Sequence, residues 1–211
     1  MKLLLLGHSF VRRLKDSVMP EARHIEVDRR HAKAFSEKLT LSDHFPETFT
    51  ICLGVNLIRH LFDKLDDIKV IHPCTVMLEI GSNDLANMSS WDSNHCLYLA
   101  NMALEFTMKL RAIGAKMVIM NSVIPRYARL CSTPDIFLRN CGTYNHILKN
   151  FCDTENGIFF CKLRGFYAPN EPSTRPKWTA DGIHCDSTHG QAMYRSRIRH
   201  NLIYQSCLQR R

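Results

Sequence analysis

The chain has 211 residues, is 45% hydrophobic and carries a formal net charge of +8. This length and apolar content suffice to bury one core, and no repeat or low-complexity linker divides the chain, so we predict a single domain over residues 1–211. No apolar run approaches the roughly 18–20 residues of a membrane span, which excludes a transmembrane segment. The apolar run at residues 3–6 is too short for a secretory signal. Nine cysteines without a regular framework are typical of reduced thiols and predict a cytoplasmic protein.

Predicted strands and helices alternate along the chain. We expect strands at 2–6, 48–53, 74–80, 116–121 and 157–162, and helices near 9–18, 56–67, 93–113, 134–152 and 187–206. This alternation predicts an α/β fold, a flavodoxin-like three-layer sandwich with a mostly five-stranded parallel sheet and helices on both faces. Residues 20–47 are rich in His, Lys and Arg, and no element is assigned to them.

Ser9 stands at the end of the first predicted strand, in the segment Gly7-His8-Ser9. The residues that follow it have the spacing of an amphipathic helix. Ligands bind open α/β sheets at the carboxyl ends of their strands, so a serine hydroxyl at this point would face the binding crevice. The same position suits a helix N-cap, for which serine is a preferred residue. Ser9 alone leaves both interpretations open.

Asn83 follows the third predicted strand, in the turn Gly81-Ser82-Asn83-Asp84. Parallel strands end at one edge, so Asn83 is expected beside Ser9. An amide NH2 group held there would donate to the oxygen that becomes negative when a nucleophile attacks a carbonyl. The alternative is that Asn83 and Asp84 only shape the turn.

The spacing Asp-x-x-His occurs four times, whereas chance predicts fewer than one occurrence for twelve aspartates and eleven histidines. The four pairs are Asp28/His31, Asp92/His95, Asp181/His184 and Asp186/His189. Asp181/His184 follows a long polar loop, residues 170–177, and directly precedes the last predicted helix. A histidine there would accept the Ser9 proton, while Asp181 would fix the tautomer of the ring.

The nearest rival is Asp186/His189. A helix from Ser187 onward would carry His189 away from the edge of the sheet. This segment also contains three possible metal ligands, His184, Cys185 and His189. The chain has no Cys-x-x-Cys pair, so we expect neither a metal nor a cofactor.

The order of these segments resembles the SGNH hydrolases, also called GDSL-type esterases and lipases, over nearly the whole chain. The resemblance implies that Ser9 is the nucleophile, that His184 is the base and that Asp181 orients it. It also implies an oxyanion hole made by Ser9, Gly54 and Asn83. The family commonly has Gly-Asp-Ser where this chain has Gly7-His8-Ser9. That aspartate is not a catalytic group, so His8 leaves the chemistry intact and changes only the hydrogen bonding around it.

A narrower resemblance rests on the phrase Leu-Gly-His-Ser-Phe-Val-Arg-Arg-Leu and on the closing Asp-Gly-Ile-His followed by Gly190 and Tyr194-Arg195-Ser196. These phrases look like a branch of the family found in invertebrates, which includes esterase domains of mobile elements.

The expected function is that of a monomeric serine esterase that hydrolyses acyl or acetyl esters of a small molecule or lipid through an acyl-enzyme intermediate. The alternative is a catalytically inactive SGNH-like binding module, since fold does not fix function. A basic phosphate-binding protein is a third possibility. Basic residues cluster at Arg12, Arg13 and Lys15, at Arg29, Arg30 and Lys33, and along the last helix at Arg195, Arg197, Arg199, Arg210 and Arg211. They predict weak contacts with anionic lipid or nucleic acid, or else form solvated helix faces.

Overall fold

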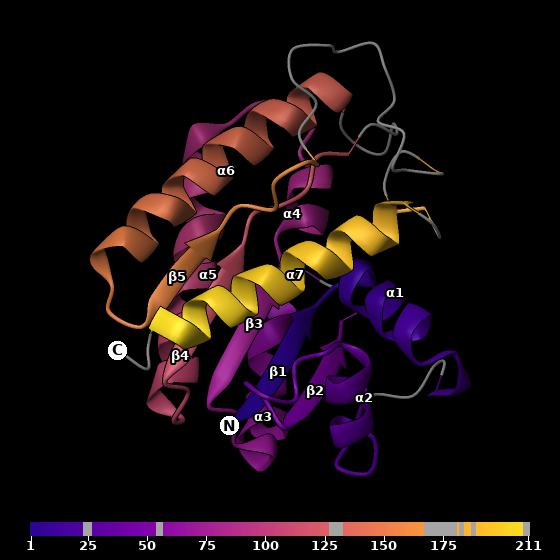
Figure 1. Ribbon diagram of the computed structural model, residues 1–211. Coiled ribbons are helices and arrows are strands. Elements are labelled where there is room, and N and C mark those ends of the chain that lie inside the picture. The colour runs from indigo at the N-terminus through magenta and orange to yellow at the C-terminus, as the bar shows by residue number, and fades with distance from the viewer. Residues whose placement is uncertain are drawn as a thin grey trace.

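A five-stranded parallel sheet forms the centre of the computed structural model, which describes residues 1–22, 27–53, 57–126, 133–166, 181, 184–186 and 189–208. The strands are β1 (Lys2–Gly7), β2 (Glu47–Cys52), β3 (Thr75–Glu79), β4 (Met117–Asn121) and β5 (Ile158–Cys161). Their order in the sheet is β2-β1-β3-β4-β5 (Figure 1). The predicted flavodoxin-like sheet is confirmed, and every strand lies within about two residues of its expected position.

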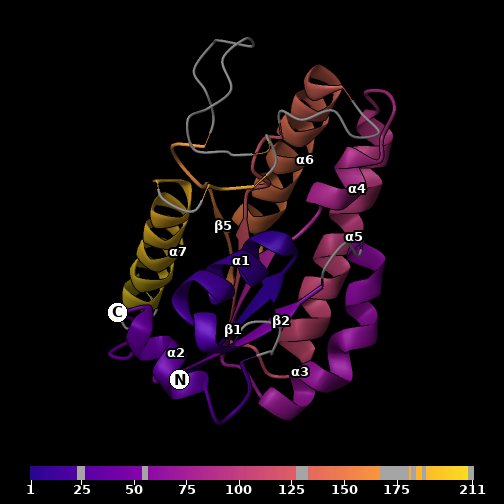
Figure 2. The same ribbon diagram turned by 90° about the vertical axis from the view of Figure 1, so that its right-hand side faces the viewer.

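Helices cover both faces of the sheet, which gives three layers (Figure 2). One layer contains α1 (Ser9–Val18), α2 (Ala32–Lys38) and α7 (His189–Leu208), and the opposite layer contains α3 (Leu65–Ile71), α4 (Ser82–Ala86), α5 (Ser93–Ala112) and α6 (Pro134–Thr154). Two 3-10 helices, η1 (Pro20–Ala22) and η2 (Ile58–Lys64), lie in the connections.

Three short elements differ from the sequence-based expectation. Helix α2 lies within the unassigned region 20–47, where Ala32 and Phe35 are its buried apolar residues. A seven-residue helix has too few turns to show a clear apolar period. The helix expected at 56–67 is divided into η2 and α3, and the five-residue helix α4 was not expected.

Strand β1 is the centre of the core, and its leucines from Leu3 to Leu6 are at most 2% exposed. In the parallel register, Gly7 lies opposite Cys52 of β2 and Glu79 of β3. Strand β2 lies on one side of β1, and β3, β4 and β5 follow on the other side. The direction in which strands are added therefore reverses between β1 and β3. Open α/β sheets bind ligands at the carboxyl end of such a switch point. Ser9 and Asn83 follow these two strands.

Gly7 allows β1 and β3 to approach closely at this edge. A Cβ atom at Gly7 would lie 2.7 Å from the carbonyl oxygen of Glu79. Any other residue would therefore push the Ser9 segment away from β3.

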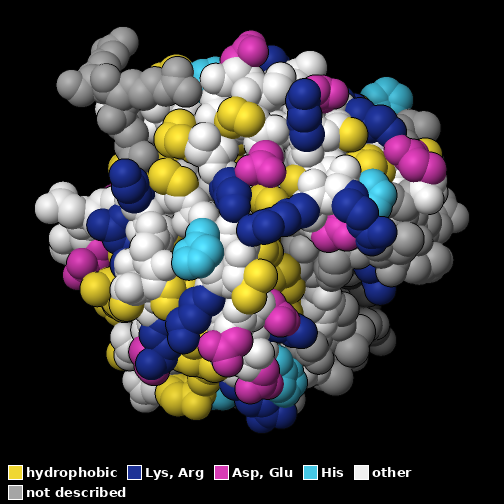
Figure 3. Space-filling view, turned by 90° about the horizontal axis from the view of Figure 1, so that it is seen from below, with side chains coloured by type: hydrophobic (Ala, Val, Ile, Leu, Met, Phe, Trp, Pro, Cys, Tyr) yellow, Lys and Arg dark blue, Asp and Glu magenta, His cyan; other side chains and the backbone are white. Residues whose placement is uncertain are grey.

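Several arginines of the basic clusters serve the packing of α7. Arg195, Arg197 and Arg199 donate to the backbone oxygens of Lys38, Arg164 and Thr40. Two of these oxygens lie at the end of α2, where helical carbonyls lack intrahelical partners. On the face seen in Figure 3, basic side chains alternate with acidic ones and form no continuous patch. Contact with lipid or nucleic acid stays a prediction. None of the helices in the described ranges combines the length and apolarity that crossing a membrane requires.

Candidate active site

Ser9 is the first residue of α1, and its side chain contacts a histidine rather than the helix backbone. The residue before the helix is His8, and its side chain makes no capping hydrogen bond. The Ser9 hydroxyl lies 3.0 Å from Nε2 of His184. The N-terminus of α1 also places a partial positive charge at this point, because the first N–H groups of a helix have no intrahelical acceptors.

His184 is held by Asp181 through two contacts. The ring nitrogen Nδ1 and Oδ2 of Asp181 are 2.7 Å apart, and the backbone N–H of His184 donates to Oδ1 at 2.7 Å. A carboxylate accepts the Nδ1 proton, which leaves Nε2 as the acceptor that faces Ser9. The ring also packs against Phe10, with ring centroids 5.8 Å apart. The structure thus brings together the three residues that the sequence analysis selected.

The surroundings of His184 keep its ring neutral. Burial lowers the pKa of His184 below its usual 6.5, Asp181 opposes this shift, and the positive charges of Arg13 and Arg126 add to it. A guanidinium nitrogen of Arg13 lies 3.9 Å from Asp181. A neutral imidazole at pH 7 is the protonation state that a general base requires.

Asn83 lies in the first turn of α4, two residues after Gly81, which is the N-cap of that helix. Gly81 has a φ of +93°, and a Cβ atom there would lie 2.8 Å from the ring of Tyr144, so only glycine fits. The Oδ1 atom of Asn83 accepts a hydrogen bond of 2.7 Å from the guanidinium of Arg126. Helix α4 follows β3, and Arg126 follows β4. Both therefore lie at the carboxyl ends of the strands, the edge of the sheet at which Ser9 also lies.

Gly54 lies outside the described residues, but the segments on either side of it are fixed. The Leu53 N–H donates to the oxygen of Gly7 at 2.8 Å, and the Ile58 N–H lies 3.2 Å from both carboxylate oxygens of Asp84. Burial raises the pKa of Asp84 to about 6, and the hydrogen bond from Ile58 opposes that rise. Asp84 therefore anchors the segment that follows Gly54.

Two buried ionisable side chains lie close to Ser9, since His8 precedes it in the chain and Glu79 lies opposite Gly7 in the sheet. Burial lowers the pKa of His8 to about 4, so its ring is neutral, and among the described residues its nitrogens have no hydrogen-bond partner. Burial raises the pKa of Glu79 to about 7, although the charge of Arg126 opposes this rise. Glu79 lines a cavity of about 10 Å³ together with Asn121 and Tyr194. The histidine at position 8 thus packs as a neutral core residue.

The other three Asp-x-x-His pairs occur at the starts of helices. Asp92 caps α5 by accepting from the N–H groups of Asn94 and His95. Asp186 accepts from the Gly190 N–H at the start of α7. Because aspartate is a preferred cap, helix starts explain why the spacing recurs.

The pair Asp28/His31 most resembles the candidate pair. His31 Nδ1 lies 3.0 Å from an Asp28 oxygen, just before α2, but the serine contact belongs to His184.

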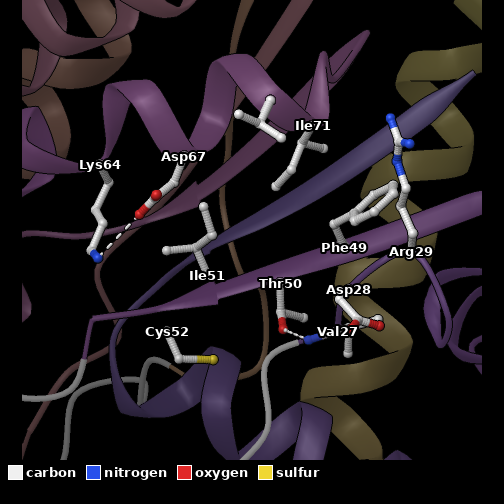
Figure 4. Close-up of a pocket in the computed structure, with 11 residues that line it drawn as sticks. Val27, Asp28, Arg29, Phe49, Thr50, Ile51, Cys52, Lys64, Asp67 and Ile71 are labelled. Atoms are coloured by element: carbon white, nitrogen blue, oxygen red, sulfur yellow. Dashed lines mark hydrogen bonds and ion pairs between the residues drawn. The ribbon is translucent and has the colours of Figure 1, made fainter.

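A larger cavity lies apart from these residues. A groove of about 350 Å³ lies between β2, α3 and residues 27–29. In Figure 4, Phe49 and Ile51 form its apolar wall, and an ion pair joins Lys64 to Asp67. The groove is not lined by Ser9, Asn83, Asp181 or His184. In the described part of the chain, no group of three His, Cys, Asp or Glu side chains is placed to hold a metal ion.

Three features of the site were not predicted from the sequence: Arg126, Glu79 and the anchoring role of Asp84. Arg126 follows β4 by five residues, so its position at the same edge of the sheet was a usable signal. The sequence signal for Glu79 was weaker: a lone carboxylate within an apolar strand.

No family model and no curated protein matches the chain. Solved structures do. A putative acylhydrolase from Bacteroides fragilis has a TM-score of 0.71 at 15% identity, with 97% of this chain and 88% of that one covered. A GDSL-like lipase from Bacteroides thetaiotaomicron has the same TM-score and coverage at 14% identity. An acetyl xylan esterase has a TM-score of 0.63 at 16% identity, with 94% and 98% covered. The chain therefore has the fold of these acylhydrolases, lipases and esterases.

Proposed function

We propose that this chain is a serine esterase of the SGNH type, which hydrolyses carboxylic esters through an acyl-enzyme intermediate. The observation that carries this proposal is the position of His184, whose ring lies between the Ser9 hydroxyl at 3.0 Å and the Asp181 carboxylate at 2.7 Å. A helix-capping serine has no need of such a pair. The fold shared with solved esterases supports the proposal at the level of architecture only.

In the first half of the reaction, Nε2 of His184 takes the Ser9 proton while Oγ attacks the ester carbonyl carbon. The carbonyl oxygen becomes negative and is stabilised by the N–H groups of Ser9 and Gly54 and by the Asn83 amide. Collapse of the tetrahedral intermediate breaks the bond to the alcohol oxygen, which receives the proton from His184. The acyl group remains on Ser9.

In the second half, His184 takes a proton from water, whose oxygen attacks the acyl carbon. Collapse releases the carboxylic acid, and Ser9 recovers its proton from His184. Asp181 stays ionised throughout, because its role is to orient the ring and stabilise the imidazolium.

The test is hydrolysis of p-nitrophenyl acetate by the wild type and by Ser9→Ala. We expect the variant to lose activity and to keep its thermal unfolding temperature within a few degrees, since the hydroxyl contributes little to the core. Folded wild-type protein that hydrolyses no short acyl ester would favour the inactive binding module.

A further inference from the structure

Arg126 is a buried cation at the edge of the candidate site. Its side chain is 5% exposed and lies 5.8 Å from the ring centroid of Phe137. Among the described residues, its guanidinium donates to Oδ1 of Asn83, at 2.7 Å. Burying a charge is costly unless it is compensated, and a neutral amide compensates it only in part. A charge kept in such a place suggests a function for this contact.

The contact selects one of the two orientations of the Asn83 side chain. A primary amide can rotate by 180° and exchange its oxygen with its NH2 group. A guanidinium has only donors. It therefore favours the orientation in which Oδ1 faces it and disfavours the one in which the NH2 group faces it. The NH2 group of Asn83 is thereby held on the other branch of the planar amide, where it can donate to a substrate oxygen.

We propose that Arg126 is a positioning residue of the oxyanion hole, which sets the orientation of the Asn83 amide and strengthens its NH2 group as a donor. This inference rests on the proposed esterase function. The positive charge behind Oδ1 polarises the amide, since hydrogen bonds in series strengthen one another. Arg126 therefore acts through Asn83 and needs no contact with the substrate.

Glu79 faces Arg126 from the sheet and bears a negative charge when it is ionised. Arg126 and Glu79 interact electrostatically, and Glu79 lies on β3 directly opposite Gly7. Within the described part of the chain no ion pair joins the two groups, and the guanidinium of Arg126 donates to Asn83. Replacing Arg126 by a neutral residue would leave a buried carboxylate without its compensating charge, so the test includes a variant that neutralises both.

The test is a double-mutant cycle between Arg126 and Asn83, read as kcat and KM for p-nitrophenyl acetate and as the rate of Ser9 labelling by a fluorophosphonate. We expect Arg126→Met to lower kcat and the labelling rate by about 10- to 100-fold, with little change in KM. In the Asn83→Ala background, the same change should cost less than about 3-fold, because the group that Arg126 orients is gone. Arg126→Lys should keep most of the activity, since lysine also has donors only.

A second readout separates this role from a merely structural one. Burial lowers the pKa of His184, Asp181 opposes this shift, and the charges of Arg13 and Arg126 add to it. The acidic limb of activity should therefore move to higher pH in Arg126→Met and stay in place in Arg126→Lys. The exposed Arg30, whose side chain is 80% exposed, provides the matched control Arg30→Met, which should change neither rate nor pH profile.

If Arg126→Met does not fold, the variant Arg126→Met with Glu79→Gln is compared with Glu79→Gln alone, and the same loss of kcat is expected. Equal losses from the Arg126 change with and without Asn83, or full activity in folded Arg126→Met, would overturn the inference. Wild-type protein that neither labels nor hydrolyses esters would instead refute the proposed function on which it rests.

Discussion

Oγ of Ser9 and Nε2 of His184 lie 3.0 Å apart although the two residues are separated by 175 positions in the chain. The packing of two helices produces this proximity. Ser9 begins α1, directly after β1, and His184 lies shortly before α7, which packs against α1. The contact joins a hydroxyl to a ring nitrogen whose own partner is a carboxylate.

The four Asp-x-x-His pairs should differ sharply on substitution. We expect His184→Ala to lower ester hydrolysis by at least about 1,000-fold, because the base is lost. His95→Ala and His189→Ala should keep most of the activity, since the aspartates of these pairs cap helices. His31→Ala is the most demanding control, because His31 also contacts an aspartate. The measurement is the initial rate with p-nitrophenyl acetate. Comparable losses at His184 and at any of the other three would contradict the assignment.

Activity should persist at mildly acidic pH. Burial lowers the pKa of His184 below 6.5, so the ring stays neutral, and able to accept the Ser9 proton, to a pH below that value. We therefore expect kcat/KM to fall to half on the acidic side at a pH below 6.5.

The exposed Arg13 contributes to this shift from beside Asp181. Arg13→Gln should raise the pKa of His184 and move the acidic limb to higher pH. Arg30→Gln should not move it, because that arginine pairs with Asp28. An acidic limb above pH 6.5 in the wild type, or one at the same pH in the wild type and in Arg13→Gln, would contradict this assignment of the base.

Glu79 should make stability fall as pH rises. Burial raises its pKa from 4.5 to about 7, so its contribution to stability is fully present below about pH 4.5 and is lost as the pH rises through 7. A glutamine has no proton to lose. Relative to the wild type, Glu79→Gln should gain stability between pH 5 and pH 8, by up to about 3 kcal/mol. Denaturant unfolding at several pH values measures the difference. A difference that stays constant with pH would show that Glu79 does not titrate in this range.

The sheet and the long helices could be predicted because their signals are local. The four leucines of β1 and the apolar run before Gly81 mark buried parallel strands, and the residue types at their ends mark the candidate site. Helix α2 was missed because seven residues give too short a period. The Arg126–Asn83 contact was missed because it joins residues 43 positions apart, and no local pattern encodes the orientation of a side-chain amide. The raised pKa of Glu79 was not predicted because it depends on burial in the folded protein.

The most direct test of the central claim is covalent labelling of the wild-type protein with a fluorophosphonate, followed by peptide mass spectrometry. A serine activated by His184 and facing an oxyanion hole attacks the phosphorus and displaces fluoride, and the phosphoryl oxygen then occupies the place of the developing oxyanion. We predict one label per chain, located on Ser9, which disappears in Ser9→Ala and is strongly slowed in His184→Ala. Folded wild-type protein that remains unlabelled, or that carries its label on another residue, would contradict the account.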